Sequence, residues 1–138
     1  MTRADPPTAA LIARYEGLTR EGLDELAGLY AEDCRFKDPF NEVRGRRAVR
    51  RIFEHMFDTV AAPRFVVRDV LAAGDQCFLG WDFHAGELVI RGVSHLRFDA
   101  AGLVVEHRDY WDAAEELYEK LPVLGALMRL LKRRLKAT

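Results

Sequence analysis

The half of the chain after residue 64 alternates runs of β-branched and aromatic residues with very short turns, and this pattern constrains the fold more than any other feature. The turns are Gly74-Asp75, Ala85-Gly86 and Ala100-Ala101-Gly102. Connections this short join neighbouring strands that run in opposite directions. The pattern therefore predicts a curved antiparallel meander of four strands, at about residues 64–73, 76–85, 88–99 and 103–111.

The residues before the meander have the spacing of amphipathic helices. Thr8 is expected to cap a first helix, whose buried face contains Leu11, Ile12, Tyr15 and Leu18. The other expected elements are a second helix from Arg20 to Tyr30, a short strand at Cys34–Lys37 and a third helix from Arg46 to about Val60. Helices followed by a meander predict an α+β fold, with the N-terminal helices on the concave face of a cone-shaped antiparallel sheet. Such a cone encloses a pocket.

Composition narrows the function classes. The 138 residues are expected to form one domain, 1–138, and 21 basic against 22 acidic side chains leave no broad basic surface for nucleic acid. Cys34 and Cys77 are too few for a disulfide framework, which favours the cytoplasm. No run approaches the roughly 18 apolar residues of a membrane span. Because no dinucleotide or phosphate-loop motif and no metal-binding histidine spacing occurs, neither a cofactor nor a metal is expected.

Residues 112–138 are expected to form a C-terminal helical extension. Asp112 can cap a segment through Glu119, and a final amphipathic helix follows Pro122. Its apolar stripe is Val123, Leu124, Leu127, Leu130, Leu131 and Leu135, opposite Lys132, Arg133, Arg134 and Lys136. The stripe is expected to pack on the open edge of the domain, over the pocket mouth or against a second subunit. Contact with anionic lipid is the less favoured alternative.

Short motifs accompany this order of elements: Tyr15 in the first helix, Phe36-Lys37-Asp38-Pro39, Gly45 before the third helix, residues 92–98 and Asp109-Tyr110-Trp111-Asp112. Over residues 8–112 the chain resembles the nuclear transport factor 2-like superfamily, which has a cystatin-like cone fold, in its SnoaL-like and ketosteroid isomerase-like branch. This superfamily contains isomerases, dehydratases, hydrolases, cyclases and non-catalytic binding domains, so the resemblance implies the fold more strongly than the chemistry.

The resemblance implies roles for three polar residues. Asp38 lies where ketosteroid isomerases have their general base, although Asp38-Pro39 is also a common turn signal. Tyr15 corresponds to the oxyanion donor, although its spacing also fits a plain core aromatic. Ser94 stands at the position of the second donor, an aspartate in the family, and Phe53 replaces a supporting tyrosine. These two departures weigh against steroid isomerase activity itself.

Strand alternation, in the register of the resemblance, places His107, Asp109 and Trp111 on the pocket face. Asp109 is a second acid/base candidate, as in SnoaL-like cyclases, with His107 as its partner. The alternative is a buried pair that only stabilises the sheet. Asp82 and His84 share this face only if the register holds, because a slip of one residue moves them outside. His55 and His95 are expected at the surface or an interface.

The predicted function is cofactor-free proton transfer on an apolar carbonyl or polycyclic compound, by an isomerase, cyclase or dehydratase. The alternative is a non-catalytic module that binds a small apolar ligand or forms dimers. The expected catalytic residues are Asp38, Tyr15, Asp109, Ser94 and His107, and the expected ligand contacts are Phe36, Phe53, Phe57, Asp82, Phe98 and Trp111. A homodimer is expected through the outer sheet face, formed by Arg91, Val93, His95, Arg97, Val104, Arg108 and Tyr110.

Overall fold

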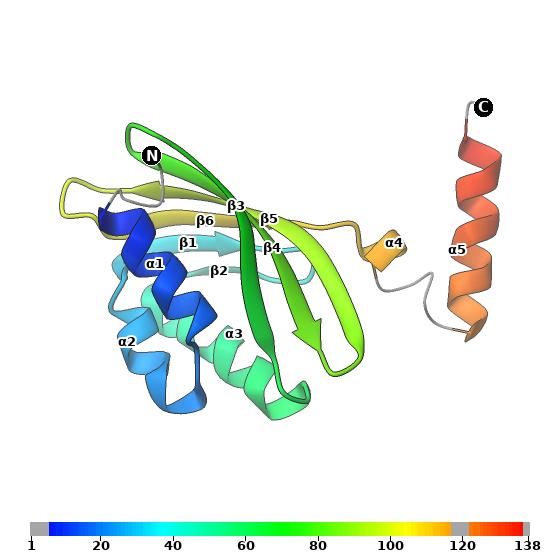
Figure 1. Ribbon diagram of the computed structural model, residues 1–138, viewed down its shortest axis with the longest axis horizontal. Coiled ribbons are helices and arrows are strands. Elements are labelled where there is room, and N and C mark those ends of the chain that lie inside the picture. The colour runs from blue at the N-terminus through cyan, green and yellow to red at the C-terminus, as the bar shows by residue number, and fades with distance from the viewer. Residues whose placement is uncertain (1–5, 117–121, 137–138) are drawn as a thin grey trace.

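The computed structural model describes residues 6–116 and 122–136, apart from the side chains of 122–124 and 128. Its helices are α1 (Pro6–Glu16), the 3-10 turn η2 (Arg20–Gly22), α2 (Leu23–Ala27), α3 (Arg46–Thr59), α4 (Ala113–Glu116) and α5 (Pro122–Leu135). Its strands are β1 (Tyr30–Lys37), β2 (Glu42–Arg44), β3 (Arg64–Ala73), β4 (Gln76–Ala85), β5 (Leu88–Phe98) and β6 (Val104–Tyr110). Figure 1 shows α1, α2 and α3 on one side of the curved sheet.

The six strands form one mixed sheet in the order β2-β1-β6-β5-β4-β3. The four-strand antiparallel meander is confirmed in β3 to β6. The prediction of a wholly antiparallel sheet is wrong at one place, because β1 runs parallel to β6. β2, which pairs antiparallel with β1, was not predicted. The fold class is otherwise confirmed: an α+β fold with a curved, unclosed sheet and helices on its concave face.

The first two helices differ from the prediction only at their ends. α1 begins at Pro6, since proline is tolerated in the first turn of a helix, and Thr8 is buried inside it. Tyr30 was predicted as the end of the second helix but opens β1 instead. The buried face of α1 contains Leu11, Ile12 and Tyr15, as the spacing predicts.

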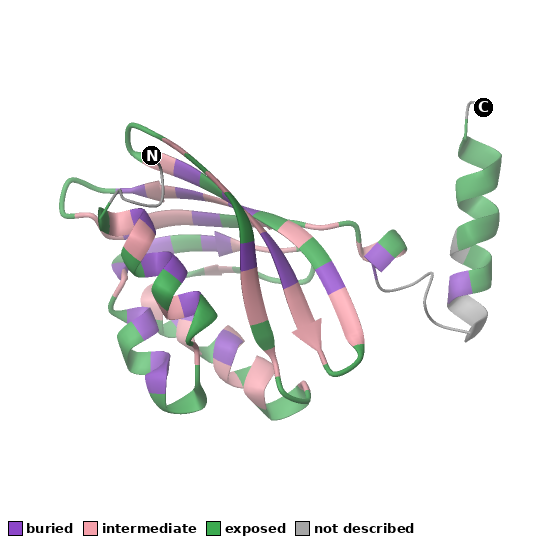
Figure 2. Cartoon of the chain, in the orientation of Figure 1, coloured by how far each residue is buried: buried purple, intermediate pink, exposed green. Residues whose placement is uncertain are grey.

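The hydrophobic core lies between these helices and the sheet. Figure 2 shows buried residues on both the helices and the strands that form it. Its most deeply buried side chains include Tyr30, Leu26, Val49, Leu79 and Leu96. Alternation along β5 is as predicted, with Ser94, Leu96 and Phe98 inward.

Val104 was predicted on the outer face of the sheet, but it is buried in the core with 1% of its surface exposed. The cause is an irregularity in the β5–β6 pairing. Phe98 pairs with Val104, whereas the preceding residue of β5, Arg97, pairs with Glu106, so β6 has one extra residue. A bulge of this kind reverses the alternation of side chains along the strand.

The chain continues beyond α4 into α5, which Figure 1 shows apart from the sheet and its covering helices. Leu127, Leu130, Leu131 and Leu135 are all exposed on it, at 40% or more. The predicted packing of this stripe over the pocket mouth is therefore not found. Val123 and Leu124 belong to the same predicted stripe, but their side chains lie outside the described residues.

Candidate functional site

An apolar cavity of about 480 Å³ opens between α3 and the concave face of the sheet. Its volume is within the range of small-molecule sites. Its apolar wall contains Phe36, Phe40, Val43, Ala48, Ile52, Phe53, Met56, Val60, Phe65, Trp81, Phe83, Ile90 and Trp111. Its polar lining is Asp38, Asn41, Arg51, His55 and Asp109. Asp38 and Asp109 thus line the same cavity.

Asp109 comes from the end of β6, where alternation turns its side chain inward. Its Oδ1 atom accepts a hydrogen bond from Ser94 Oγ at 2.5 Å and lies 2.6 Å from His107 Nε2. No hydrogen bond to its Oδ2 atom is found among the described residues. Because no buried side-chain oxygen in that part of the chain lacks a partner, Oδ2 must be accessible. The carboxylate therefore has one oxygen held by Ser94 and His107 and one that is accessible.

His107 links this carboxylate to the core. Its ring is 2% exposed, and its Nδ1 atom lies 2.6 Å from the hydroxyl of Tyr30 and 3.2 Å from that of Tyr15. A phenol is a stronger donor than acceptor, so the network assigns Nδ1 as the acceptor in the neutral ring and places the ring proton on Nε2. The Nε2–H group then donates to Asp109. This arrangement orients the imidazole as carboxylate–histidine pairs do in acid/base sites.

Tyr15 and Tyr30 form the inner end of the network. Their hydroxyls hydrogen-bond each other, and neither side chain lines the apolar cavity. Burial raises the pKa of both phenols well above the ordinary value of 10.0, because a phenolate here would lose its hydration. Both hydroxyls therefore remain protonated donors. Tyr15 is linked to Asp109 through His107 and also lines a small hollow of about 20 Å³ beside Asp109, so its predicted role as a substrate donor stays a prediction.

These two tyrosines predict a loss of stability in alkali. Their pKa is raised in the folded state, so the folded chain keeps protons that the unfolded chain releases above about pH 10. Stability is unaffected below that pH and should fall above it, by up to about 1.4 kcal/mol per pH unit for each tyrosine. Urea unfolding between pH 8 and 11 checks this.

The same measurement in Tyr15→Phe should give a shallower alkaline decline. Tyr110→Phe is the matched control, because Tyr110 is 49% exposed. Equal slopes in the wild type and Tyr15→Phe would show that the buried pair does not cause the decline.

Ser94 and Trp81 hold the other side of Asp109. Trp81 Nε1 donates to Ser94 Oγ at 2.8 Å, so Ser94 directs its own proton to Asp109. The predicted donor to a substrate oxygen is therefore a donor to the carboxylate. Trp81 and Tyr30 were both missed by the sequence analysis. Trp81 could have been found, because Trp81 and Asp82 are neighbours in a strand and must face opposite sides of the sheet. No local pattern in the sequence places Tyr30 beside His107.

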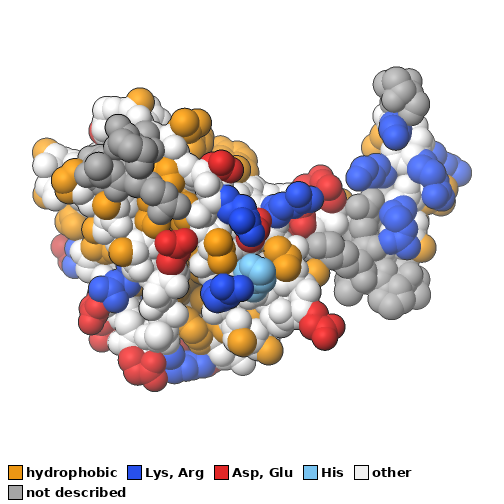
Figure 3. Space-filling model, viewed as in Figure 1, with side chains coloured by type: hydrophobic (Ala, Val, Ile, Leu, Met, Phe, Trp, Pro, Cys, Tyr) orange, Lys and Arg blue, Asp and Glu red, His pale blue; other side chains and the backbone are white. Residues whose placement is uncertain are grey.

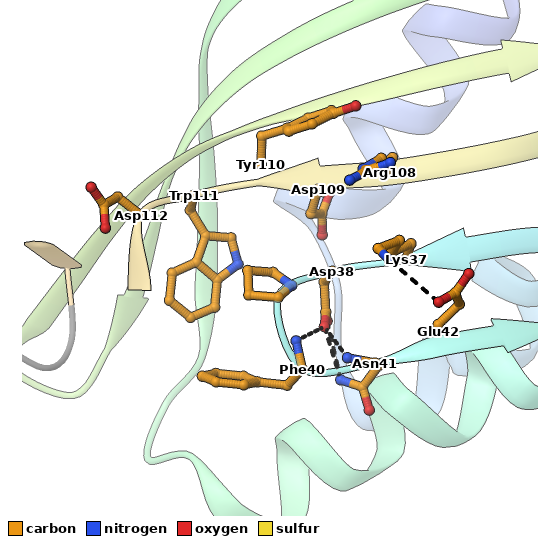
Figure 4. A pocket seen from close by; sticks show the side chains of 11 residues that line it. Lys37, Asp38, Phe40, Asn41, Glu42, Arg108, Asp109, Tyr110, Trp111 and Asp112 are labelled. Carbon is orange, nitrogen blue, oxygen red and sulfur yellow. Dashed lines mark hydrogen bonds and ion pairs between the residues drawn. The ribbon is translucent and has the colours of Figure 1, made fainter. Parts of the chain in front are cut away.

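Asp38 lies in the turn between β1 and β2, and Figure 4 shows its carboxylate directed at that turn. Oδ1 accepts hydrogen bonds from the backbone amides of Phe40 at 2.8 Å and Asn41 at 2.6 Å. The Asn41 side-chain amide lies 3.1 Å from each carboxylate oxygen. These contacts are those of an aspartate that stabilises a turn, which the Asp-Pro sequence also indicates.

The turn between β1 and β2 forms one edge of the cavity, called its lip. Phe40 and Trp111 meet there edge to face, with ring centroids 5.4 Å apart. A second hollow of about 650 Å³ lies on the other side of this lip (Figure 4), and it is lined by charged residues such as Lys37, Glu42 and Arg108. Asp38 and Asp109 border both hollows. The apolar one is the better candidate for binding, because its walls can exclude water.

The predicted ligand contacts divide into two groups. Phe36, Phe53 and Trp111 line the cavity. Phe57 and Phe98 do not: Phe57 lies on α3 under the Arg20 guanidinium, and Phe98 belongs to the core.

Asp82 does not face the cavity either, which corrects the prediction. It pairs with Arg68 on the opposite face of the sheet, because Trp81 and Phe83 occupy the inward positions of β4. The register differs by one residue from the one expected, and Phe78 and His84 accordingly lie on the outer face with Asp82. His55, expected at the surface, is exposed but also lines the cavity.

Within residues 6–116 and 122–136, no group of three or more potential ligands is placed to hold a metal ion. In the same part of the chain, no helix is long and apolar enough to cross a membrane.

A curved sheet under three helices, with a carboxylate–histidine pair in an apolar cavity, defines a class of cone-shaped α+β proteins. A family model described as the SnoaL-like domain matches residues 11–107. The chain therefore belongs to the SnoaL-like family, within the nuclear transport factor 2-like superfamily. No curated protein sequence matches it.

Solved structures show the same fold. A presumed ketosteroid isomerase from Kribbella flavida has 26% identity and a TM-score of 0.68, covering 92% of this chain and 90% of its own. A presumed isomerase of the SnoaL-like family from Agrobacterium tumefaciens has 20% identity and a TM-score of 0.69, with 81% and 99% covered. A nuclear transport factor 2-like protein of unknown function from Cytophaga hutchinsonii has 16% identity and a TM-score of 0.67, with 83% and 93% covered.

Proposed function

We propose that this protein catalyses proton transfer on an apolar carbonyl or polycyclic compound, with Asp109 as the acid/base residue. The observation that carries the proposal is the position of Asp109. One of its oxygens is fixed by Ser94 and His107, the other is accessible, and the residue lines an apolar cavity. A carboxylate held in this way has a defined direction and few competing water molecules. The presumed isomerases among the structural relatives support the same class of reaction.

The step begins with a substrate whose carbonyl lies among the cavity aromatics. Oδ2 of Asp109 removes a proton from the carbon beside the carbonyl, and the C–H electron pair moves into an enolate. Asp109 is then a neutral carboxylic acid and returns the proton to the same carbon or to another one. His107 keeps its Nε2 proton and hydrogen-bonds Oδ1 in both states. Tyr15, Tyr30 and Ser94 act through this pair as positioning residues.

Hydrogen exchange tests this function without knowledge of the natural substrate. A rigid apolar ketone, 2-tetralone, is incubated with the protein in D2O, and deuterium uptake beside the carbonyl is followed by NMR. Uptake faster than in buffer, and saturable in ketone, is the expected result. An exchange rate equal to that of buffer for 2-tetralone and for larger cyclic ketones would contradict the proposal.

A non-catalytic binding module is the alternative, and the largely aromatic wall of the cavity favours it. Such a module would derive its affinity from apolar burial. Ligand affinity would then fall in Phe36→Ala or Trp111→Ala, whereas the wild type would exchange no ketone protons.

We also propose a homodimer through the outer sheet face. Val93 and Tyr110 are direct neighbours across β5 and β6, and both are exposed, as is Phe78. Apolar side chains exposed together on a sheet face mark an interface. Val93→Glu should raise the dimer dissociation constant at least about tenfold, measured by sedimentation equilibrium, because it buries an unpaired charge. Ala13→Glu, at an exposed position of α1 on the other side of the sheet, is the control. A monomeric wild type would contradict the proposal.

A further inference from the structure

We propose that the apolar cavity takes a ligand with a carboxylate at one end, held by Arg51 and His55. This inference rests on the proposed function, because it concerns the same cavity. It adds the chemical class of the ligand. Arg51 and His55 are four residues apart on α3, which places them one above the other on one face of the helix. Both line the cavity, and both are exposed at its edge.

Arg51 is the arginine of α3 that lines the cavity, and it has no acidic partner among the described residues. Arg50, the preceding residue, pairs with Asp24 and Glu54, and Arg20 pairs with Asp58. The acidic residues of the cavity do not supply a partner, since Asp38 is bonded to its own turn and Asp109 to Ser94 and His107. The planar guanidinium of Arg51 therefore has its donors available at the mouth of an apolar cavity.

A carboxylate fits this arrangement. Arginine binds carboxylates through two parallel hydrogen bonds, and such a bond is strengthened beside apolar walls. One guanidinium charge matches one carboxylate charge, and the His55 imidazole adds a further donor. The aromatic walls would hold the ring system of the ligand between this end and Asp109, which comes from the sheet. The substrate class is therefore an aromatic or polycyclic carboxylic acid with a ketone.

Fluorescence titration with 2-naphthoate and its neutral analogue 2-naphthamide tests the inference. The wild type should bind the carboxylate at least tenfold more tightly than the amide. Arg51→Gln should remove that ratio and leave amide affinity unchanged, and His55→Gln should reduce the ratio less. Arg47→Gln is the matched control, because Arg47 is exposed on the same helix and does not line the cavity.

Equal affinity for the two probes, an equal effect of Arg47→Gln, or no binding of either probe up to its solubility limit would overturn the inference. These outcomes are independent of the ketone exchange assay. A protein that exchanges ketone protons but does not prefer naphthoate would lose only the carboxylate inference. One that prefers naphthoate but exchanges nothing would lose only the catalytic proposal.

A different observation carries a second inference: we infer that α5 lies on an anionic lipid surface. Residues 122–138 have five Lys or Arg and no Asp or Glu, whereas residues 1–121 have 16 basic and 22 acidic residues. Figure 3 shows the Lys and Arg side chains gathered over α5. Leu127, Leu130 and Leu131 are exposed on one face of this helix. Helical spacing places Arg129, Lys132 and Lys136 opposite them and Arg134 beside them. A basic helix with an exposed apolar face is the form that binds in the plane of an anionic bilayer.

The body of a second copy is a poorer partner for this helix. The exposed apolar residues of the outer sheet face, Phe78, Val93 and Tyr110, lie beside Arg91, Arg97 and Arg108 on the same face. Arg91 and Arg97 pair with Glu116, Asp75 and Glu106, but Arg108 lies over the Tyr110 ring, so a basic helix that covered Tyr110 would meet this like charge. An anionic bilayer offers an apolar layer beneath negative headgroups, so it satisfies both faces of α5, while the acidic remainder of the chain stays in water.

Vesicle sedimentation with the full-length protein tests this inference. Binding is expected to vesicles of phosphatidylcholine with phosphatidylglycerol and to be at least tenfold weaker to phosphatidylcholine alone. Reversal of three charges, Lys132→Glu with Arg133→Glu and Arg134→Glu, should abolish it, and Leu130→Glu with Leu131→Glu should weaken it at least tenfold. The matched control reverses the exposed Arg44, Arg47 and Arg64 and should bind as the wild type does.

Equal binding to both vesicle types, or equal loss in the two triple variants, would overturn the lipid inference. A third outcome would also overturn it: sedimentation without lipid detects an oligomer, and replacement of Leu130 and Leu131 dissociates it. The leucine face would then contact a second copy of the chain.

Discussion

Asp109→Asn should slow ketone proton exchange by at least about 10²-fold, the usual size of a general acid/base contribution. Asparagine has nearly the same shape, and its side-chain oxygen can still accept the bonds from Ser94 and His107. The group facing the cavity would then be an amide, which cannot take up a proton at neutral pH. The rate is measured by NMR in D2O, and binding of 2-naphthoate by the same variant shows whether the cavity is intact.

Asp38→Asn is the comparison that distinguishes the two carboxylates. The Asp38 carboxylate accepts hydrogen bonds from the backbone amides of Phe40 and Asn41. The side-chain oxygen of an asparagine can accept the same two hydrogen bonds. We expect a change in exchange rate of less than about fivefold, far below an acid/base contribution. A loss of 10²-fold in Asp38→Asn with an active Asp109→Asn would instead assign the base to Asp38, as the family resemblance implies.

Gly92→Ala should lower the free energy of unfolding by about 2 to 3 kcal/mol, the upper part of the range for an overpacked core. Gly92 pairs directly with Trp81 across β4 and β5, and the indole lies over the glycine. A Cβ atom at residue 92 would be 2.4 Å from the nearest ring carbon. The ring must therefore move, which strains its hydrogen bond to Ser94. Urea unfolding measures the change.

Gly28→Ala provides the matched control. Gly28 follows α2 with a helical φ of −64°, and a Cβ atom there would lie 3.4 Å from its nearest neighbour, an ordinary contact. We expect a change within about 0.5 kcal/mol, or slight stabilisation from the stiffer unfolded chain. Equal effects of the two substitutions would show that the Trp81 contact does not govern the position.

Much of the architecture could be predicted because its signals are local. Hairpin turns between Gly74 and Gly102 define a meander whatever surrounds them, and the 3.6-residue period of α1 identifies its buried face. The parallel pairing of β1 with β6 has no such signal, since the two strands are about 70 residues apart in the chain. Such pairing depends on where the intervening elements place the strand ends.

The candidate site was predicted in part for the same reason. Alternation in β6 places His107 and Asp109 on one face, and the structure brings both into one network at the cavity. Alternation does not say which face is inward, so Asp82 was assigned to the wrong side of β4. Tyr30, the residue nearest His107 Nδ1, was assigned to a helix because the apolar spacing of the second helix continues into it.

Local patterns are enough to predict the four meander strands, their turns, the buried face of α1 and the shared face of His107 and Asp109, because each depends on residues close together in the chain. The position of β1 beside β6, the contact of Tyr30 with His107 and the place of Arg51 and His55 at the cavity of Asp109 follow from the tertiary structure alone. Those contacts join segments far apart in sequence, and backbone pairing and core packing, rather than local periodicity, select them.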